Sequence, residues 1–466
     1  MHGRHPYWAI FSVALMTFIG VLNETSMNVT YPVLAKEFGV SLDVVQWITG
    51  GYLLMVTIVM GTTAYCLRQW AARWLHLAAV SAFVIGDLIC ALAVNFPMLL
   101  AGRLIQAIAT GFSTPMMFFL IFTQIPRERL GVMNGVAGMV ISLAPALGPT
   151  YGGAVLAAGS WRVIFWLILP LALLSLIAGQ LTIRNQPFGN SQLFSFWALF
   201  LLAGSLFSIV TGVARFGKSG WTSSCWLLLL LGLILFGGFV WLNQHGKTRL
   251  FDLGVFAQSS VRLSEWTYFS LQFINIGASL ALPIYCEYVL HASSLTAGMV
   301  LLPGSLLGAV MAPLSGFLAD RYRYGYGLPT RLGSVLIVLG TTGLLVFQSQ
   351  LTPLSVMVLF IAMRLGFNAA FSNTIANAST LVAKEKSTDV NSIFNMTQQF
   401  AGSLGVGIMT ALIALSQNQG QGSMALRTFK GSRLDFWLLV ILAFSVLVAV
   451  WLNFSRQQQL KNTAAK

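Results

Sequence analysis

The sequence predicts an all-α integral membrane protein with fourteen transmembrane helices. Of its 466 residues, 57% are hydrophobic and 8% are charged, whereas an ordinary soluble domain has about 25% charged residues. The apolar residues form runs that can cross a bilayer, which takes roughly 20 residues in a helix. Because a helix satisfies its own backbone hydrogen bonds in hydrocarbon, each run is expected to be helical.

Cutting the chain at charges and turn clusters separates the candidate spans. They are expected at about 8–32, 45–66, 76–95, 98–124, 132–157, 162–183, 192–213, 223–243, 264–290, 295–319, 331–349, 353–382, 390–416 and 435–455. The first run has no small-residue cleavage site, so it is predicted to stay as an uncleaved span. If the N-terminus is cytoplasmic, Lys and Arg are more frequent in the cytoplasmic loops than in the outer loops. This bias predicts that both termini are cytoplasmic.

Weak internal similarity suggests a duplicated bundle. Arg103-Leu104 in the fourth span recurs as Arg364-Leu365 in the twelfth, and the second and tenth spans both end near an arginine. We predict two pseudo-symmetric six-helix bundles, at residues 1–190 and 246–466, with an inserted helix pair at 191–245 and a short cytoplasmic tail. Repeats of this kind enclose a substrate site near the middle of the bilayer.

The fifth span combines features that bend a helix with features that let helices pack closely. Prolines remove backbone hydrogen bonds and bend the helix, and small residues four apart let a neighbouring helix approach its backbone. We predict a hinge here; ordinary close packing is the alternative. Its residues are Gly138, Pro145, Gly148, Pro149, Gly152 and Gly153.

This spacing resembles the antiporter motif of drug exporters in the major facilitator superfamily. The order is Gly138, nine residues, Gly148-Pro149, two residues and Gly152-Gly153. The resemblance extends over the whole chain to the fourteen-span drug:proton antiporters. It implies the major facilitator fold and export of hydrophobic or cationic compounds by alternating access, driven by protons entering across a bacterial cytoplasmic membrane.

Glu24 is the first candidate for proton coupling, because it lies well inside the first span. Desolvation disfavours the charged form of a carboxyl, so Glu24 could gain or lose a proton as its exposure changes. The stretch from Val21 to Pro32 resembles the first-span signature of the same exporters, but Asn23 stands where their common Asp would be. A shift of one position turns a side chain by about 100° on a helix. A structural carboxyl paired to a neighbour is the alternative.

Arg103 and Asp87 are the other candidates for proton coupling. The stretch Leu99 to Gly111 resembles the fourth-span motif of the exporters, whose arginine is implied in coupling. A guanidinium favours the charged form of a nearby carboxyl and so promotes release of its proton; alternatively, Arg103 bonds backbone carbonyls within the bundle. Asp87 belongs to no motif that we recognise. It could be a second protonation site, a counter-ion for Arg103 or a neutral acid bonded to another helix.

Substrate should be bound by side chains that face a central cavity. Met and aromatic surfaces can repack around different ligands, and amides at spanning depth can hydrogen-bond, although lipid contact and helix packing use the same residue types. Glu287 lies at the outer end of its span, where a surface role is favoured over a site for cationic substrate. The candidates are Met27, Asn28, Gln106, Met116, Phe273, Asn275, Glu287, Asn368 and Phe371.

Major facilitators usually carry a gating loop after the second span, with an acidic residue and glycines. Here Arg68 stands in place of the acid and Ala71 in place of a glycine. In the second half, Asp320 and Arg321 keep part of this pattern. We therefore predict an inner gate at Asp320 and Arg321.

Several function classes lack support in the sequence. There is no nucleotide-binding loop, no paired cysteine spacing typical of a metal site and no basic patch for nucleic acid. We expect no cofactor, no metal and no enzymatic activity, with small substrates, protons and the bilayer as partners of a functional monomer. Two alternatives remain: a narrow-specificity exporter or symporter of a metabolite, lipid or antibiotic, and a membrane enzyme or sensor that does not transport.

Overall fold

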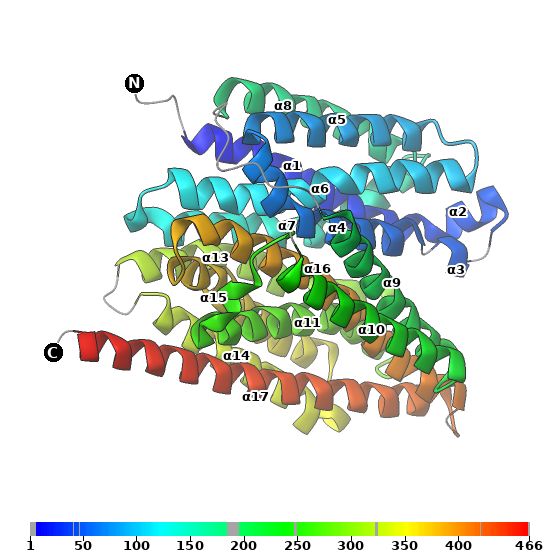
Figure 1. The fold of residues 1–466 in the computed structure, drawn as a ribbon. Coiled ribbons are helices and arrows are strands. Elements are labelled where there is room, and N and C mark those ends of the chain that lie inside the picture. Colours follow the sequence, from blue (N-terminus) through cyan, green and yellow to red (C-terminus); the bar gives the residue numbers. More distant parts are fainter. Residues whose placement is uncertain are drawn as a thin grey trace.

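The computed structural model is helical and describes residues 6–40, 42–45, 47–183, 195–246, 249–321, 325–419 and 421–464. Both termini lie at one end of the long helices, at the left of Figure 1. We call this the termini end. The opposite end, where α2 and α3 lie, is the far end.

The first half of the chain forms one helical bundle (Figure 1). Its elements are α1 (Pro6–Ser26), η1 (Met27–Thr30), α2 (Tyr31–Phe38), α3 (Leu42–Val45), α4 (Trp47–Gln69), α5 (Ala72–Ala91), α6 (Phe96–Gln124), η2 (Arg127–Arg129), α7 (Leu130–Ala157) and α8 (Val163–Thr182). Two more long helices follow, α9 (Phe196–Ser219) and α10 (Ser223–His245).

The second half forms the other bundle. Its elements are η3 (Leu253–Ala257), α11 (Ser259–Tyr288), α12 (Ser294–Met299), α13 (Leu302–Arg321), α14 (Gly327–Val346), η4 (Gln348–Gln350), α15 (Pro353–Thr380), α16 (Lys384–Gln419) and α17 (Met424–Ala464). Helices α4 and α6 of the first half contact α16, and α7 contacts both α13 and α15. The two bundles therefore meet along two seams, one between α4 and α16 and the other between α7 and α13.

The prediction of fourteen spans is confirmed, since fourteen helices in the described residues are long and apolar enough to cross a membrane. Each lies over one of the predicted segments. The main difference is at the helix ends, because α11, α16 and α17 begin at Ser259, Lys384 and Met424, earlier than the apolar runs suggested. The predicted bundle boundary at 190/191 lies outside the described residues, and the division into 1–190, 191–245 and 246–466 stays a prediction.

Local sequence explains several of the helix ends. The Asn95 side chain accepts a hydrogen bond of 2.9 Å from the backbone N–H of Met98, and so caps the start of α6. Thr352 and Ser355 form a reciprocal capping box at the start of α15, where Pro353 occupies the first turn. Gly39 ends α2 with φ of 63°, a left-handed conformation that suits glycine.

Helices α9 and α10 pack against each other, and α9 also contacts both bundles. It meets α4 of the first half and α16 of the second half. The ring centroids of Trp47 on α4 and Phe207 on α9 lie 5.8 Å apart, and a Cβ on Gly217 of α9 would overlap the backbone of Ala411 on α16. Helix α9 therefore covers the seam between α4 and α16.

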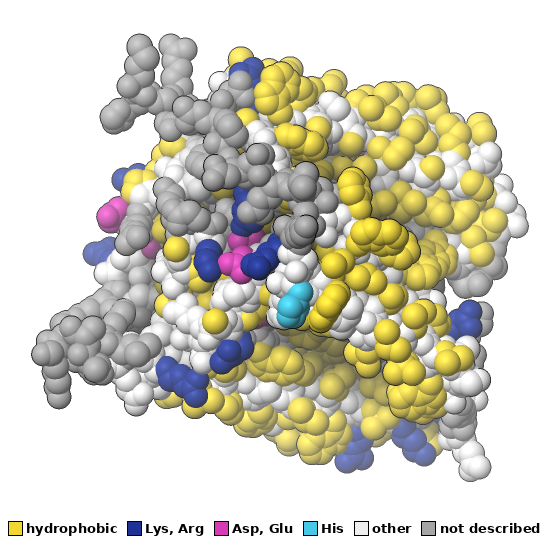
Figure 2. Space-filling model, in the orientation of Figure 1, with side chains coloured by type: hydrophobic (Ala, Val, Ile, Leu, Met, Phe, Trp, Pro, Cys, Tyr) yellow, Lys and Arg dark blue, Asp and Glu magenta, His cyan; other side chains and the backbone are white. Residues whose placement is uncertain are grey.

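The outer surface is that of a protein embedded in lipid. In Figure 2 hydrophobic side chains cover most of the visible face, and charged side chains gather towards the termini end. Helix α10 carries exposed Trp226, Leu230, Ile234 and Trp241. A helix that is apolar on all sides and still exposed at the surface is typical of a membrane span. The chain is a multi-pass membrane protein.

Candidate functional site

A cavity of about 840 Å³ lies between the two bundles. Its walls come from the far-end parts of the helices, because they include Val21 and Thr25 of α1, Pro145 and Thr150 of α7 and Leu302 at the start of α13. Met299 at its rim is 55% exposed. The cavity therefore occupies the far half of the protein and reaches its surface there.

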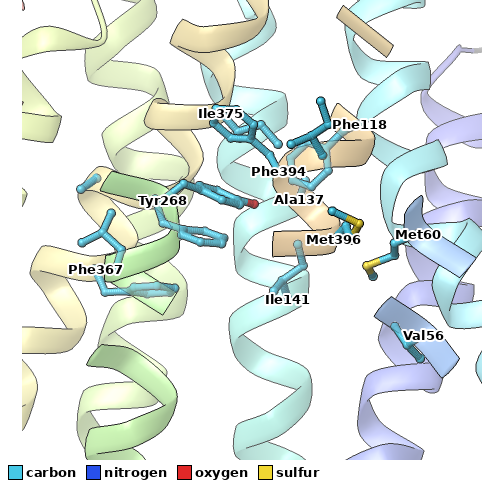
Figure 3. Close-up of a cluster of buried hydrophobic side chains, with 14 of the residues drawn as sticks. Val56, Met60, Phe118, Ala137, Ile141, Tyr268, Phe367, Ile375, Phe394 and Met396 are labelled. Carbon is cyan, nitrogen blue, oxygen red and sulfur yellow. The ribbon is translucent and has the colours of Figure 1, made fainter. Parts of the chain in front are cut away.

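A hydrophobic plug closes this cavity towards the termini end. Met60, Ile141 and Phe367 line the cavity, and they belong to one cluster of buried side chains contributed by both bundles. Figure 3 shows this cluster, with Val56 and Met60 on one side and Tyr268 and Phe367 on the other. Its other labelled members are Phe118, Ala137, Ile375, Phe394 and Met396. Water in the cavity is thus separated from the termini end by packed apolar side chains.

Glu24 lies on the cavity wall. It is 9% exposed, and its buried Oε2 atom has no hydrogen-bond partner among the described residues. No ion pair joins Glu24 to a cation within the described part of the chain, although the charge of Arg103 acts on it. A carboxyl buried without a partner is costly in its charged form. This arrangement suits a group that changes its protonation state when the cavity opens or closes.

Arg103 and Asp87 are joined through Gln106 behind the cavity wall. The Arg103 Nη1 donates to Gln106 Oε1 at 3.0 Å, and Gln106 Nε2 donates to Asp87 Oδ1 at 2.7 Å. The Arg103 guanidinium carbon also lies 4.2 Å from the centroid of the Tyr52 ring. Gln106 thus connects two groups that the sequence suggested separately. Asp87 makes no direct ion pair with Arg103, so they interact through the amide.

Arg364, the second-half counterpart of Arg103 in the Arg-Leu repeat, lies on the cavity wall itself. It donates a hydrogen bond to Asn275 Oδ1, and its guanidinium carbon lies 5.4 Å from the centroid of the Phe367 ring. Its Nε has no partner among the described residues. The cavity therefore has an acid on the first-half wall and a cation on the second-half wall, and the repeat was the signal that could have identified Arg364 as a cavity residue.

Most of the other cavity candidates do not line this cavity. Among the described residues, Asn275 does, whereas the remaining eight candidates do not. Met27, Met116, Phe273 and Phe371 are buried in packing, and Asn28 accepts hydrogen bonds from Tyr31 and Thr49. Gln106 is hydrogen-bonded to Arg103. Asn368 accepts a hydrogen bond of 2.6 Å from the cavity residue Ser142. Glu287 is half-buried near the end of α11.

The glycines of α7 are used differently along the helix. Near the termini end, a Cβ on Gly135 or Gly138 would overlap α13 or α15 of the second half. Near the far end, a Cβ on Gly148 or Gly152 would overlap the Thr25 to Val29 stretch of the first half. Pro145 and Pro149 lie beside this change and line the cavity. The termini end of α7 thus packs against the second-half bundle, and its far end packs against the first-half bundle.

Two sets of polar contacts close the termini end. Asp320 at the end of α13 accepts hydrogen bonds of 2.7 and 2.8 Å from the backbone N–H groups of Gly131 and Val132, at the start of α7. This carboxylate lies at the positive end of the helix dipole. The Arg321 guanidinium carbon lies 5.6 Å from the Phe317 ring centroid on the same helix. The predicted gate residue Asp320 therefore connects the bundles, whereas Arg321 is exposed beside it.

The other set lies at the α4–α16 seam. Arg68, which replaces the usual acid of the first-half loop, forms an ion pair with Asp389 of α16. Nearby, Lys386 Nζ lies 2.9 Å from Asp252 Oδ2. The hydrogen bond from Lys386 holds the pKa of Asp252 below its usual range, despite desolvation. The sequence analysis did not identify a partner for Arg68. The structure shows that its partner, Asp389, comes from the opposite bundle.

Exchanging the charges of this pair should preserve the contact. Arg68→Asp alone brings two acids together, and Asp389→Arg alone does the same with two arginines. We expect each single variant to lower the transport rate by about tenfold, which corresponds to about 1.4 kcal/mol. The double variant Arg68→Asp with Asp389→Arg should recover much of that loss. Uptake into vesicles with matched protein content measures all three, and a double variant no better than the singles would show that the pair does not hold the gate.

Three acids with buried carboxyl oxygens were missed by sequence reasoning. They are Glu265 on α11, Asp389 on α16 and Asp435 on α17. Both carboxyl oxygens of Asp435 lack partners among the described residues, and Glu265 and Asp389 have one such oxygen each. All three lie within one residue of a predicted span boundary, where a charge signals a helix end. Their positions inside longer helices could not be seen in the apolar pattern.

Comparisons with known proteins agree with this architecture. The family model described as Major Facilitator Superfamily matches residues 13–193 and 184–406. The chain is 30% identical to the lincomycin resistance protein LmrB of Listeria monocytogenes over 88% of this chain and 87% of that protein. For LmrB of Bacillus subtilis these values are 31%, 88% and 86%. A multidrug resistance protein B homolog of Mycobacterium tuberculosis is 27% identical over 90% of this chain and 80% of its own length.

Solved structures share the fold at low sequence identity. The proton:xylose symporter XylE aligns with a TM-score of 0.68 and 12% identity over 96% of this chain and 95% of its own. The human organic anion transporter MFSD10 aligns with a TM-score of 0.63 and 17% identity over 94% of this chain and 99% of its own. Family, relatives and fold together support a transporter rather than an enzyme. The chain belongs to the major facilitator superfamily.

Proposed function

We propose that this protein is a proton-coupled multidrug efflux antiporter of the bacterial cytoplasmic membrane. It exports hydrophobic or cationic compounds by alternating access and needs no cofactor beyond the proton gradient. The observation that carries the proposal is Glu24, an acid without a partner on the wall of the cavity between the two bundles. Relatives named for lincomycin and multidrug resistance support drugs as the cargo.

The termini end is assigned to the cytoplasm, because loops there are richer in Lys and Arg. With this orientation the cavity faces outwards, and the plug and the two gate contacts face inwards. The structure then corresponds to the outward-open state of the cycle. In this state Glu24 can take up a proton from outside, and uptake favours substrate release because a neutral carboxyl no longer attracts a cation.

Proton flux in liposomes tests the proposal directly. The purified protein is reconstituted with a pH-sensitive dye inside, and ethidium is added as a cationic probe. We expect the addition of ethidium to change the pH inside the liposomes. This pH change should collapse when the membrane is made permeable to protons. Ethidium transport without proton movement would reject coupling, and absence of transport across a broad panel of drugs would reject multidrug export.

A carrier for one polar compound is the second candidate. The second-half wall of the cavity presents the amides of Gln272, Asn275, Gln398 and Gln399 beside Arg364. This concentration of hydrogen-bonding groups could recognise one polar cargo rather than many apolar ones. Uptake of a single compound, with no transport of dyes or biocides, would favour this candidate.

A further inference from the structure

A second acid, Glu265, lies beside the plug and does not line the cavity that Glu24 lines. Glu265, Tyr268 and Gln272 stand three and four residues apart on α11, so they share one helix face. Gln272 lines the cavity and Tyr268 belongs to the plug. Because α11 begins at the termini end, Glu265 lies one turn beyond Tyr268 towards that end. It is hidden from the cavity in which Glu24 is accessible.

Two separate hydrogen-bonded pairs of polar side chains join α11 and α16 beside the plug. Gln398 on α16 lines the cavity and accepts a hydrogen bond of 2.9 Å from the Tyr268 hydroxyl. The neighbouring Thr397 donates its hydroxyl hydrogen bond to Glu265 Oε1. The Tyr268 ring stacks on Phe371 at a centroid distance of 4.1 Å and lies 5.2 Å from the ring of Phe394. Hydrogen-bonded polar side chains thus lie beside a group of aromatic rings in the plug.

Within the part of the chain that the structure describes, the carboxyl of Glu265 forms no ion pair with a cation. Its Oε2 is buried and unpaired among the described residues, and no ion pair involves it. On α16 the nearest charges are Asp389 and Lys386, eight and eleven residues before Thr397 and therefore about 12 and 16 Å away along the helix. Arg262 on α11 donates to the backbone of Phe256. An ionised carboxylate in this position would be costly.

Among the described residues, the elements packed on α11 provide no ion-pair partner for Glu265. On α17, Asn453 donates to Ser264 beside Glu265, while Arg456 is exposed. On α15 the side chains near Tyr268 are aromatic. In η3 and the loop before it, Asp252 is engaged by Lys386. Among the described residues, the titratable group that interacts electrostatically with Glu265 is Tyr268.

We propose that Glu265 is a second proton-binding site, which exchanges its proton with the cytoplasm when the plug opens towards the termini end. Glu24 and Glu265 lie on the first helices of the two predicted bundles, Glu24 on the cavity wall and Glu265 one turn from Tyr268 towards the termini end. Alternating access then exposes one acid at a time. This inference rests on the proposed transport function for its role in coupling, but proton binding by Glu265 can be measured without transport.

The test combines infrared spectroscopy with transport. In the full-length protein, a pH titration follows the carbonyl stretch of protonated carboxyl groups, with Glu265→Gln compared with the wild type. The amide oxygen of glutamine still accepts the Thr397 hydrogen bond, which limits structural loss. We expect part of the carbonyl signal to disappear in Glu265→Gln. In liposomes we expect this variant to exchange ethidium without a gradient but to move fewer protons per ethidium than the wild type.

Two further variants distinguish proton binding from a structural role. Glu265→Asp keeps an acid and should restore the carbonyl signal and part of the coupling. Thr397→Val removes the hydrogen bond but keeps the acid, so it should retain both. An unchanged carbonyl signal in Glu265→Gln would overturn the proposal. The wild type could move no protons with ethidium while Glu265→Gln still loses part of the carbonyl signal. That result would reject the coupling of drug export to protons but support proton binding by Glu265.

Discussion

Glu24→Gln is expected to abolish uphill drug export while leaving drug exchange across the membrane measurable. Glutamine keeps the shape of the side chain but cannot carry a proton. Each charge moved across 100 mV supplies about 2.3 kcal/mol, enough for roughly a fifty-fold gradient. Without the proton this driving force is lost, whereas binding to the cavity walls remains. Accumulation in inverted vesicles under a pH gradient measures the loss, and exchange of labelled substrate at equal pH measures the remainder.

The matched control for this change is Glu24→Asp. It keeps the acid on the same wall of the cavity and should retain pH-dependent export at a reduced rate. Asp87→Asn provides the comparison within the membrane, because Asp87 lies behind the wall and is bound through Gln106. If Glu24→Gln transports fully and Asp87→Asn does not, coupling belongs to the Arg103 cluster.

Gly148→Leu is expected to block transport without preventing membrane insertion. Even a methyl group at this position would overlap the Thr25 side chain, and the backbone nitrogen of Ser26 would lie 3.1 Å away. Overpacking of this kind costs about 1–3 kcal/mol and pushes α7 away from α1, next to the bend at Pro145 and Pro149. Leucine favours insertion into the bilayer, so the variant should still reach the membrane.

Gly153→Leu is the control for the hinge, because a Cβ at Gly153 would meet nothing within 4 Å. It belongs to the same sequence motif and makes the same chemical change. We expect it to transport at close to the wild-type rate. The test compares the transport rates of Gly148→Leu and Gly153→Leu, normalised to membrane protein content. Equal activity of the two variants would mean that the glycines of α7 serve packing without a hinge.

The number of spans could be predicted because apolar length is a local property of the sequence. Helix ends were less accessible: α11, α16 and α17 continue past the apolar runs into charged sequence. This continuation brought Glu265, Asp389 and Asp435 into the protein interior. The partner of Asp389 is distant in the chain, because Arg68 and Asp389 are 321 residues apart. A pattern of local hydrophobicity carries no information about such pairs.

The cavity was harder to predict than the fold for a related reason. Most spans are apolar around their whole circumference, so periodicity does not indicate which face meets lipid, a neighbouring helix or the cavity. Met27 and Met116 therefore looked as suitable as Asn275, yet they are fully buried in packing. Glu24 stood out because a charge inside the membrane is costly and limits where a side chain can lie, whereas Arg364 was noted only as part of the Arg-Leu repeat.

The position of α9 affects how hydrophobic compounds can enter the protein from the lipid bilayer. A hydrophobic compound dissolved in the bilayer could reach the space between two rocking bundles sideways, through either seam. Helix α9 blocks the α4–α16 seam by touching both sides of it. Side entry is therefore expected along α7 and α13 alone, so the two faces of the transporter differ in what they admit from the membrane.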